Sequence, residues 1–152
     1  MIELYKPEYK DLWFRKTLLC DSPTMAYNNA YGGTIDFSES KWAKWFDCWV
    51  NNSDGTRFYR YLQNDCKDFV GEIAYRLDDE KYIVSVIVHA KYRGNGYGRE
   101  GLRLLCEEAK NRGIKTLYDD ISVDNPSIAM FLKEGFVEAY RTPEIVMLKK
   151  DL

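Results

Sequence analysis

A glycine-rich turn between an apolar run and a helical pattern constrains this chain more than any other feature. The turn reads Arg-Gly-Asn-Gly-Tyr-Gly over residues 93–98, after the apolar run 82–88 and before a helix expected from Gly98 to about Arg112. A helix entered through such a turn presents its first backbone N–H groups at its positive end. Glycines let the backbone turn sharply and approach a ligand closely. The sequence therefore predicts a pocket for a phosphate or pyrophosphate at this turn.

The rest of the chain predicts alternating strands and helices. Strands are expected at 2–6, 57–63, 69–76, 82–88, 116–123 and near 144–148, and helices at 8–20, 36–50, 98–112 and 125–134, with a long loop over 21–35. Short polar turns separate the three central strands, which favours an antiparallel meander. Asp36 followed by Glu39 resembles a helix-start cap, and we expect Trp42, Trp45 and Trp49 on one face of that helix to belong to the core.

Length and composition set broad limits. A chain of 152 residues with 45% hydrophobic residues is typical of a single globular domain, here residues 1–152. The formal charge of −2 gives no general reason to expect a nucleic acid partner. No apolar stretch approaches 18 residues, and the four cysteines are too far apart for a zinc site. We expect a cytoplasmic protein with reduced thiols, no metal and no membrane partner.

Two glycine motifs overlap in the turn, and the first is a dinucleotide fingerprint. Residues 96–101 read Gly-Tyr-Gly-Arg-Glu-Gly, and the acidic pair Asp119-Asp120 follows about 20 residues later. The surrounding elements oppose this interpretation, because residues 89–95 separate the turn from its strand and an antiparallel meander precedes it. An NAD(P)-dependent oxidoreductase remains an alternative.

The second motif places an arginine three residues before a Gly-x-Gly pair, as Arg93, Gly96 and Gly98. Before it stands Val-Ile-Val-His-Ala-Lys-Tyr over residues 86–92, and a segment from Asn125-Pro126 to Gly135-Phe136 lies near the C-terminus. Together these segments resemble the acyl-CoA-binding parts of the GNAT superfamily of N-acetyltransferases. The order of elements extends the resemblance over nearly the whole chain.

The resemblance implies an α+β fold in α/β/α layers, with a mostly antiparallel mixed sheet whose fourth and fifth strands splay apart around acetyl-CoA. Backbone groups near Ile87 and Val88 would bind the pantetheine arm like a missing strand. The implied cofactor-binding residues are Ile87, Val88, Arg93, Gly94, Asn95, Gly96, Tyr97, Gly98, Arg99 and Asn125. Tyr27 and Tyr31, in the loop between the first two helices, would shape the acceptor site, although packing under the loop is an equal alternative.

Catalytic groups are harder to assign. Many members of the superfamily use a tyrosine in the last helix as the acid that protonates the leaving thiolate, and here that position falls on Phe131 or, in another alignment, on Leu132. Glu72 and Asp119 are candidate catalytic carboxylates. Glu72 is otherwise an outward-facing polar residue of an alternating strand. Asp119 shares a face with Leu117 and Ile121, where a carboxylate should be paired or shifted in pKa.

The sequence therefore leads to one principal hypothesis. The protein transfers an acetyl group from acetyl-CoA directly to a primary amine of a small molecule or peptide. An alternative is a protein of the same fold that binds acyl-CoA as a sensor or partner module, because the usual tyrosine is absent. The resemblance also makes a homodimer a candidate assembly, and His89 is expected to be a solvated turn residue.

Overall fold

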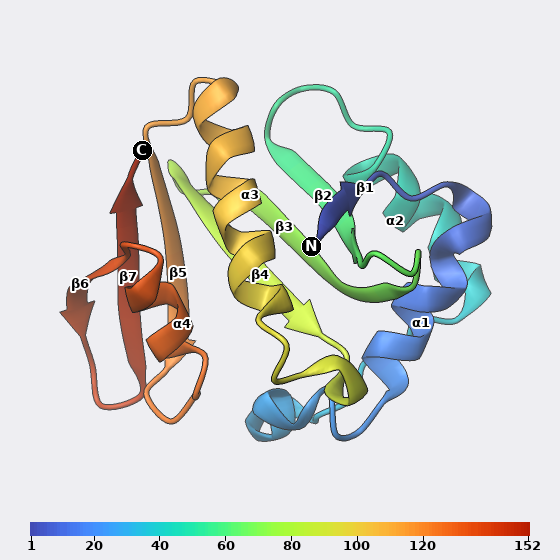
Figure 1. Ribbon diagram of the computed structural model, residues 1–152, viewed down its shortest axis with the longest axis horizontal. Coiled ribbons are helices and arrows are strands. Elements are labelled where there is room, and N and C mark those ends of the chain that lie inside the picture. Colours follow the sequence, from blue (N-terminus) through green and yellow to red (C-terminus); the bar gives the residue numbers. More distant parts are fainter.

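The computed structural model describes residues 1–152, except for the side chains of residues 30 and 31. One seven-stranded sheet, in the order β1-β2-β3-β4-β5-β7-β6, forms the middle of three layers. Helices α3 and α4 cover one face and α1 and α2 the other (Figure 1). The predicted α+β fold class is confirmed.

The fold consists of β-strands, α-helices and short 3-10 turns. The strands are β1 (Glu3–Tyr5), β2 (Arg57–Gln63), β3 (Phe69–Asp78), β4 (Lys81–Val88), β5 (Thr116–Ser122), β6 (Val137–Arg141) and β7 (Ile145–Asp151). The helices are α1 (Leu12–Cys20), α2 (Trp42–Trp49), α3 (Tyr97–Asn111) and α4 (Ile128–Lys133). Short 3-10 turns are η1 (Tyr9–Asp11), η2 (Ala26–Tyr31), η3 (Glu39–Lys41) and η4 (Ala90–Tyr92).

Three expectations about these elements are wrong. Strand β6 has no counterpart in the sequence prediction, because all five of its residues are exposed and it lacks an alternating apolar face. The second helical segment has its N-cap at Ser38, and Asp36 instead accepts a hydrogen bond from the Ser38 N–H. Helix α4 begins after Ser127, while the Asn125 side chain accepts the Ser127 N–H just before it.

The sheet divides between β4 and β5. The meander β2-β3-β4 is antiparallel, as predicted, whereas β4 and β5 run parallel and pair only at Tyr82 with Leu117 and at Ile83 with Tyr118. Beyond these positions the strands separate, and β5 continues to pair with β7 as far as Ser122. One half of the sheet therefore ends at β4 and the other begins at β5, and the two strands diverge in Figure 1.

Two hydrophobic clusters hold the layers together. One packs α3 and α4 against the sheet, and the other joins α1, α2 and the opposite face. The tryptophans of α2 were predicted to belong to the core. They do pack against the second cluster, but they are only partly buried, so they lie at its edge. Gly101 explains the close approach of α3 to β2, because a Cβ there would lie 2.7 Å from a methyl carbon of the buried Leu62.

Among the described residues, no helix is both long and apolar enough to cross a membrane.

Candidate active site

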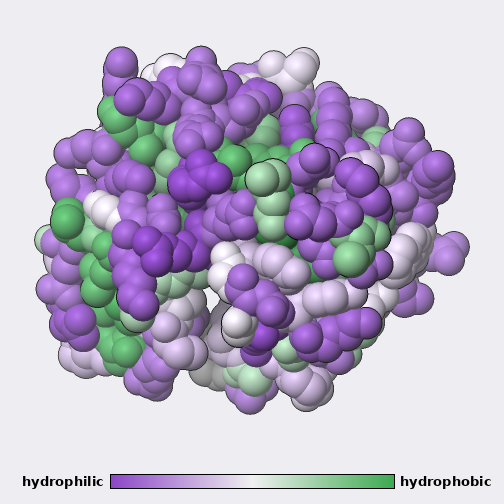
Figure 2. Space-filling model, in the orientation of Figure 1, coloured by the Kyte–Doolittle hydropathy of each residue, from purple (hydrophilic) through white to green (hydrophobic). Residues whose placement is uncertain are grey.

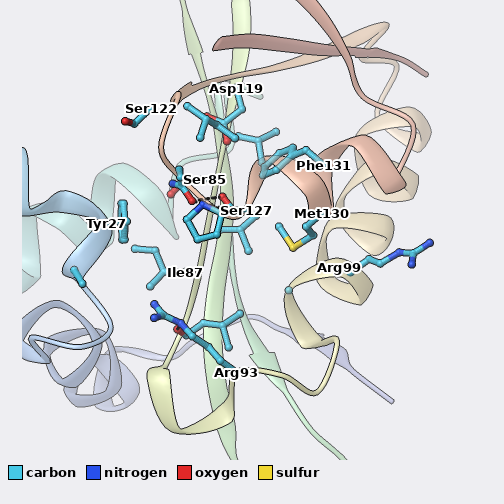
Figure 3. Close-up of a pocket in the computed structure, with 18 of the residues that line it drawn as sticks. Tyr27, Ser85, Ile87, Arg93, Arg99, Asp119, Ser122, Ser127, Met130 and Phe131 are labelled. Atoms are coloured by element: carbon cyan, nitrogen blue, oxygen red, sulfur yellow. Dashed lines mark hydrogen bonds between the residues drawn. The ribbon is translucent and has the colours of Figure 1, made fainter. Parts of the chain in front are cut away.

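The opening between β4 and β5 is a cleft of about 1230 Å³. Its walls are β4, β5, the start of α3, the segment leading into α4, and the turn η2. Figure 2 shows a notch in the surface at the lower margin of this face, between the β5–β7 half and the turn after β4. Figure 3 shows Arg93 at one end of the cleft and Asp119 at the other.

Strand β4 presents to the cleft peptide N–H groups that have no partner strand. The hydrogen bond from the His89 N–H to the Val70 carbonyl, at 2.8 Å, fixes which peptides of β4 face β3. Because successive peptides of a strand point to opposite sides, those of Ile87 and Ser85 also face β3. Those of Val86 and Val88 face the cleft. Of the two residues predicted to hold a pantetheine arm, Val88 therefore has the suitable backbone orientation, and Ile87 contributes its side chain to the lining.

The N-terminus of α3 lies at one end of the cleft. Its N-cap is Gly96, which has no side chain with which to cap the first N–H groups. Gly94 and Gly96 have φ values of +85° and +76°, which favour glycine, and the turn thereby aims the amides of residues 97–99 toward the cleft. Glu100, in the first turn of α3, accepts the Ile2 N–H instead of capping the helix. This set of donors fits a diphosphate, the group that acetyl-CoA would bring.

Arg93 stabilises the turn through hydrogen bonds to neighbouring backbone carbonyls. Its guanidinium donates hydrogen bonds to the carbonyls of Val88, at 3.3 Å, Pro23, at 3.3 Å, and Thr24, at 2.7 Å. The buried Thr24 hydroxyl also accepts the Ala90 N–H at 2.9 Å. Arg93 therefore joins the end of β4 to the loop before η2, and its donors are engaged by backbone carbonyls.

The other predicted polar contacts lie around the rim. The Arg99 side chain points away from the cleft in Figure 3 and pairs with Glu134, which directly follows α4, at 2.5 Å. Asn95 donates to the Tyr92 carbonyl and is not part of the lining, whereas Asn125 does line the cleft. The positive end of the cleft thus consists mainly of backbone amides, with the arginine side chains engaged elsewhere.

The turn η2 forms the outer wall. Tyr27 lines the cleft and is 47% exposed, and burial raises the pKa of its hydroxyl. The side chain of Tyr31 lies outside the described residues. His89 caps η4 by accepting the Lys91 N–H, and its Nε2 lies 3.7 Å from Asp21.

Glu72 lies in a buried network behind the cleft wall. Its exposure is 4%, so the alternative that it faces outward is wrong. Arg15 Nη1 donates to both carboxylate oxygens at 2.6 Å, and the Tyr59 hydroxyl donates to the same carboxylate. The Arg15 guanidinium also stacks on Trp45, 4.4 Å from the ring centroid. Glu72 is not among the residues that line the cleft, and its catalytic role stays a prediction.

Asp119 lies where the two halves of the sheet separate. It directly follows Tyr118, the last β5 residue paired with β4, and it stands opposite Leu148 of β7. Its neighbours on the same face, Leu117 and Ile121, are buried. Burial raises the pKa of the Asp119 carboxyl well above its usual value, and the adjacent Asp120 carboxylate raises it further.

Phe131 lines the cleft from α4, together with Met130 and Lys133. It is 2% exposed and packs edge-on against Phe136, whereas Leu132 is 49% exposed. Of the two positions considered for the usual acid, Phe131 is therefore the one that reaches the cleft. Figure 3 shows Phe131 and Asp119 toward the same end of the cleft.

Sequence reasoning missed Arg15 and Thr24. Arg15 lies 57 residues from its partner Glu72, and Thr24 lies 69 residues from Arg93. No local pattern marks such pairs. The only signal was indirect, since a glutamate within an otherwise apolar strand requires a partner.

Comparisons with known structures agree with this geometry. The spermidine N-acetyltransferase of Vibrio cholerae, solved in complex with CoA and spermine, has a TM-score of 0.83 at 15% identity, covering 99% of this chain and 95% of that one. An N-acetyltransferase from Staphylococcus aureus Mu50 has a TM-score of 0.77 at 19% identity, covering 99% and 98%. The PaiA N-acetyltransferase of Thermoplasma acidophilum, in complex with coenzyme A, has a TM-score of 0.75 at 15% identity, covering 100% and 99%. No individual curated protein sequence matches this chain.

A sheet split between β4 and β5, with a helix N-terminus at the split, defines the class as the GNAT fold. The model of the acetyltransferase (GNAT) family matches residues 6–136. The chain belongs to this family, and the predicted resemblance is confirmed.

Proposed function

We propose that this protein is an N-acetyltransferase that moves an acetyl group from acetyl-CoA directly to a primary amine, without a covalent enzyme intermediate. The proposal depends above all on one observation: cleft-facing peptides of β4 lead to the uncapped N-terminus of α3. Family membership supports acetyl transfer, and the Vibrio cholerae neighbour is solved with the amine spermine. The acceptor here is the primary amine of a small molecule or peptide.

The cleft would hold the donor along its length. The amides at the start of α3 would bind the pyrophosphate, and the peptides of Val88 and Val86 would bind the pantetheine arm. One of these N–H groups would also polarise the thioester carbonyl for attack by the neutral amine. Tyr27 would contact the acceptor at the outer wall. Cytoplasmic location and a homodimer stay predictions.

Donor binding is tested first. Acetyl-CoA should raise the melting temperature, and NAD⁺ or NADP⁺ should not. The variant Gly96→Asp should lose most of the affinity for CoA in calorimetry, because a carboxylate would repel the pyrophosphate. Gly96→Asn is the matched control: Asn and Asp tolerate the positive φ alike, and only Asp adds charge. Equal affinity of the two variants would place the pyrophosphate elsewhere.

Transfer is tested by release of the CoA thiol with a panel of amines. The panel should hold polyamines, amino acids, aminoglycosides and peptides with free N-termini or lysines. At least one class should release thiol in proportion to acetylated product, which mass spectrometry identifies. If acetyl-CoA binds but no amine reacts, the protein is instead an acyl-CoA-binding module of the same fold, a second candidate that Phe131 at the cleft favours.

A further inference from the structure

The departing thiolate needs a proton donor at the inner end of the cleft. A strand rises about 3.3 Å per residue, so the five residues from Val84 to Val88 span roughly 16 Å. An extended pantetheine arm that begins at the α3 N-terminus and follows β4 would carry its sulfur inward along this stretch. The sulfur would approach the last pair that still joins β4 and β5, which is Ile83 with Tyr118.

Asp119 is the acidic group set at that point on the α4 side of the sheet. It lines the cleft one residue beyond the last β4–β5 pair, and it shares its face with the buried Leu117 and Ile121. Phe131, toward the same end of the cleft, has no proton to donate (Figure 3). Ser85 and Ser122 also line the cleft, but both are exposed and hydroxyls are weak acids.

We infer that Asp119 is the general acid that protonates the CoA thiolate, an inference that rests on the proposed acetyl transfer. The amine nitrogen attacks the thioester carbonyl carbon, and a C–N bond forms. As the C–S bond breaks, its electron pair stays on sulfur, and the Asp119 O–H proton moves to that sulfur. The extra proton on the new amide nitrogen then returns to the Asp119 carboxylate. The sum is amine plus acetyl-CoA giving amide plus CoA thiol.

The charged groups around Asp119 suit a carboxyl that holds its proton. The Asp120 carboxylate, next to it on β5, raises its pKa, and Arg76 of β3 lowers it less strongly. The Asp119 carboxylate in turn raises the pKa of Tyr27 on η2, although less than burial and Glu72 do. The neighbour on β7 is the buried apolar Leu148, and α4 contributes Phe131. A raised pKa keeps the proton on the Asp119 carboxyl, where it is available to the departing thiolate.

The decisive experiment measures kcat against pH with one amine from the panel, at saturating acetyl-CoA. Asp119→Asn should lower kcat by roughly 10²- to 10⁴-fold, the usual contribution of a general acid, and leave the Kd for CoA unchanged. In the wild type, kcat should fall as pH rises through the pKa of Asp119. Asp120→Asn should move this fall to lower pH, and Arg76→Met should move it to higher pH. A ¹³C NMR titration of the Asp119 carboxyl in the CoA complex should give the same pKa.

Each outcome bears on one claim. An active wild type with an equally active Asp119→Asn variant overturns the inference and leaves the proposed function standing. So does a kcat that rises through the pKa and shifts with Asp120→Asn, since this is the behaviour of a base. A wild type that acetylates no amine defeats the proposed function, and the inference falls with it.

Discussion

At the scale of single residues, the buried pair of Arg15 and Glu72 is the most consequential feature outside the cleft. Glu72 is 4% exposed and accepts from both Arg15 and Tyr59, while Trp45 covers the guanidinium. Removal of one member of a buried pair leaves an uncompensated charge, and this costs more than the pair itself contributes.

Arg15→Met should therefore destabilise the protein by about 3–5 kcal/mol in urea denaturation. The double variant Arg15→Met/Glu72→Gln should recover a large part of that loss, because no buried charge remains. The matched control is Arg103→Met, which removes an exposed i,i+4 pair with Glu107 and should cost at most about 0.5 kcal/mol. Similar losses for Arg15→Met and Arg103→Met would contradict the importance of burial.

The raised pKa of Asp119 leads to a second prediction about a single residue. Its pKa is raised in the folded protein, so between the unfolded pKa and the folded pKa the native state binds more protons than the unfolded state. Stability should fall as pH rises through that window. Asp119→Asn should remove this loss, and the variant should become increasingly more stable than the wild type as pH rises. Parallel stability curves in urea titrations from pH 3 upward would exclude the raised pKa.

The sequence predicted those site residues whose role is local. Gly94 and Gly96 occupy left-handed backbone in a short turn, and a six-residue motif is enough to mark them. Asp119 was singled out by strand alternation alone. Arg93 was expected to face the phosphates, yet its donors bind carbonyls of Pro23 and Thr24, 70 and 69 residues away. Such contacts depend on the packing of distant segments, which no local pattern contains.

At the scale of elements, β4 has two kinds of peptide along one strand. Those of Ser85 and Ile87 are paired with β3, and those of Val86 and Val88 face the cleft. Strand β4 was predictable because it is apolar and flanked by turns. Strand β6 was not, because an exposed edge strand carries little pattern.

Amide hydrogen exchange should reveal this alternation. In the free protein, Val86 and Val88 should exchange faster than Ser85 and Ile87. Saturating acetyl-CoA should slow Val86 and Val88 the most, because the pantetheine arm would take up their free N–H groups. Exchange at single-residue resolution by NMR checks this, and equal protection of all four amides by acetyl-CoA would contradict it.

At the scale of the whole molecule, the sheet is two halves joined by few direct pairs. β4 and β5 pair at two positions, and α3 and α4 cover the same face across the division. A ligand in the cleft touches both halves, so it should stabilise them together. The order of elements predicted this division only through the family resemblance, since composition says nothing of where a sheet opens.

Acetyl-CoA at 100 times its Kd should add about 2.7 kcal/mol to the free energy of unfolding. The urea transition should shift to higher concentration as a single step, whether it is followed by tryptophan fluorescence or by far-UV circular dichroism. Two separate transitions, with only one moved by the ligand, would mean that the halves unfold independently.

The contacts of Arg93 have a consequence for how the two substrates bind. They fasten the loop that leads to Tyr27 onto the turn that would receive the pyrophosphate. A donor that orders the turn would thereby order the wall that meets the acceptor, and such coupling is reciprocal. Acetyl-CoA and the amine would therefore each raise the affinity for the other by the same factor. Loss of the Arg93 side chain would weaken this synergy while both sites persist.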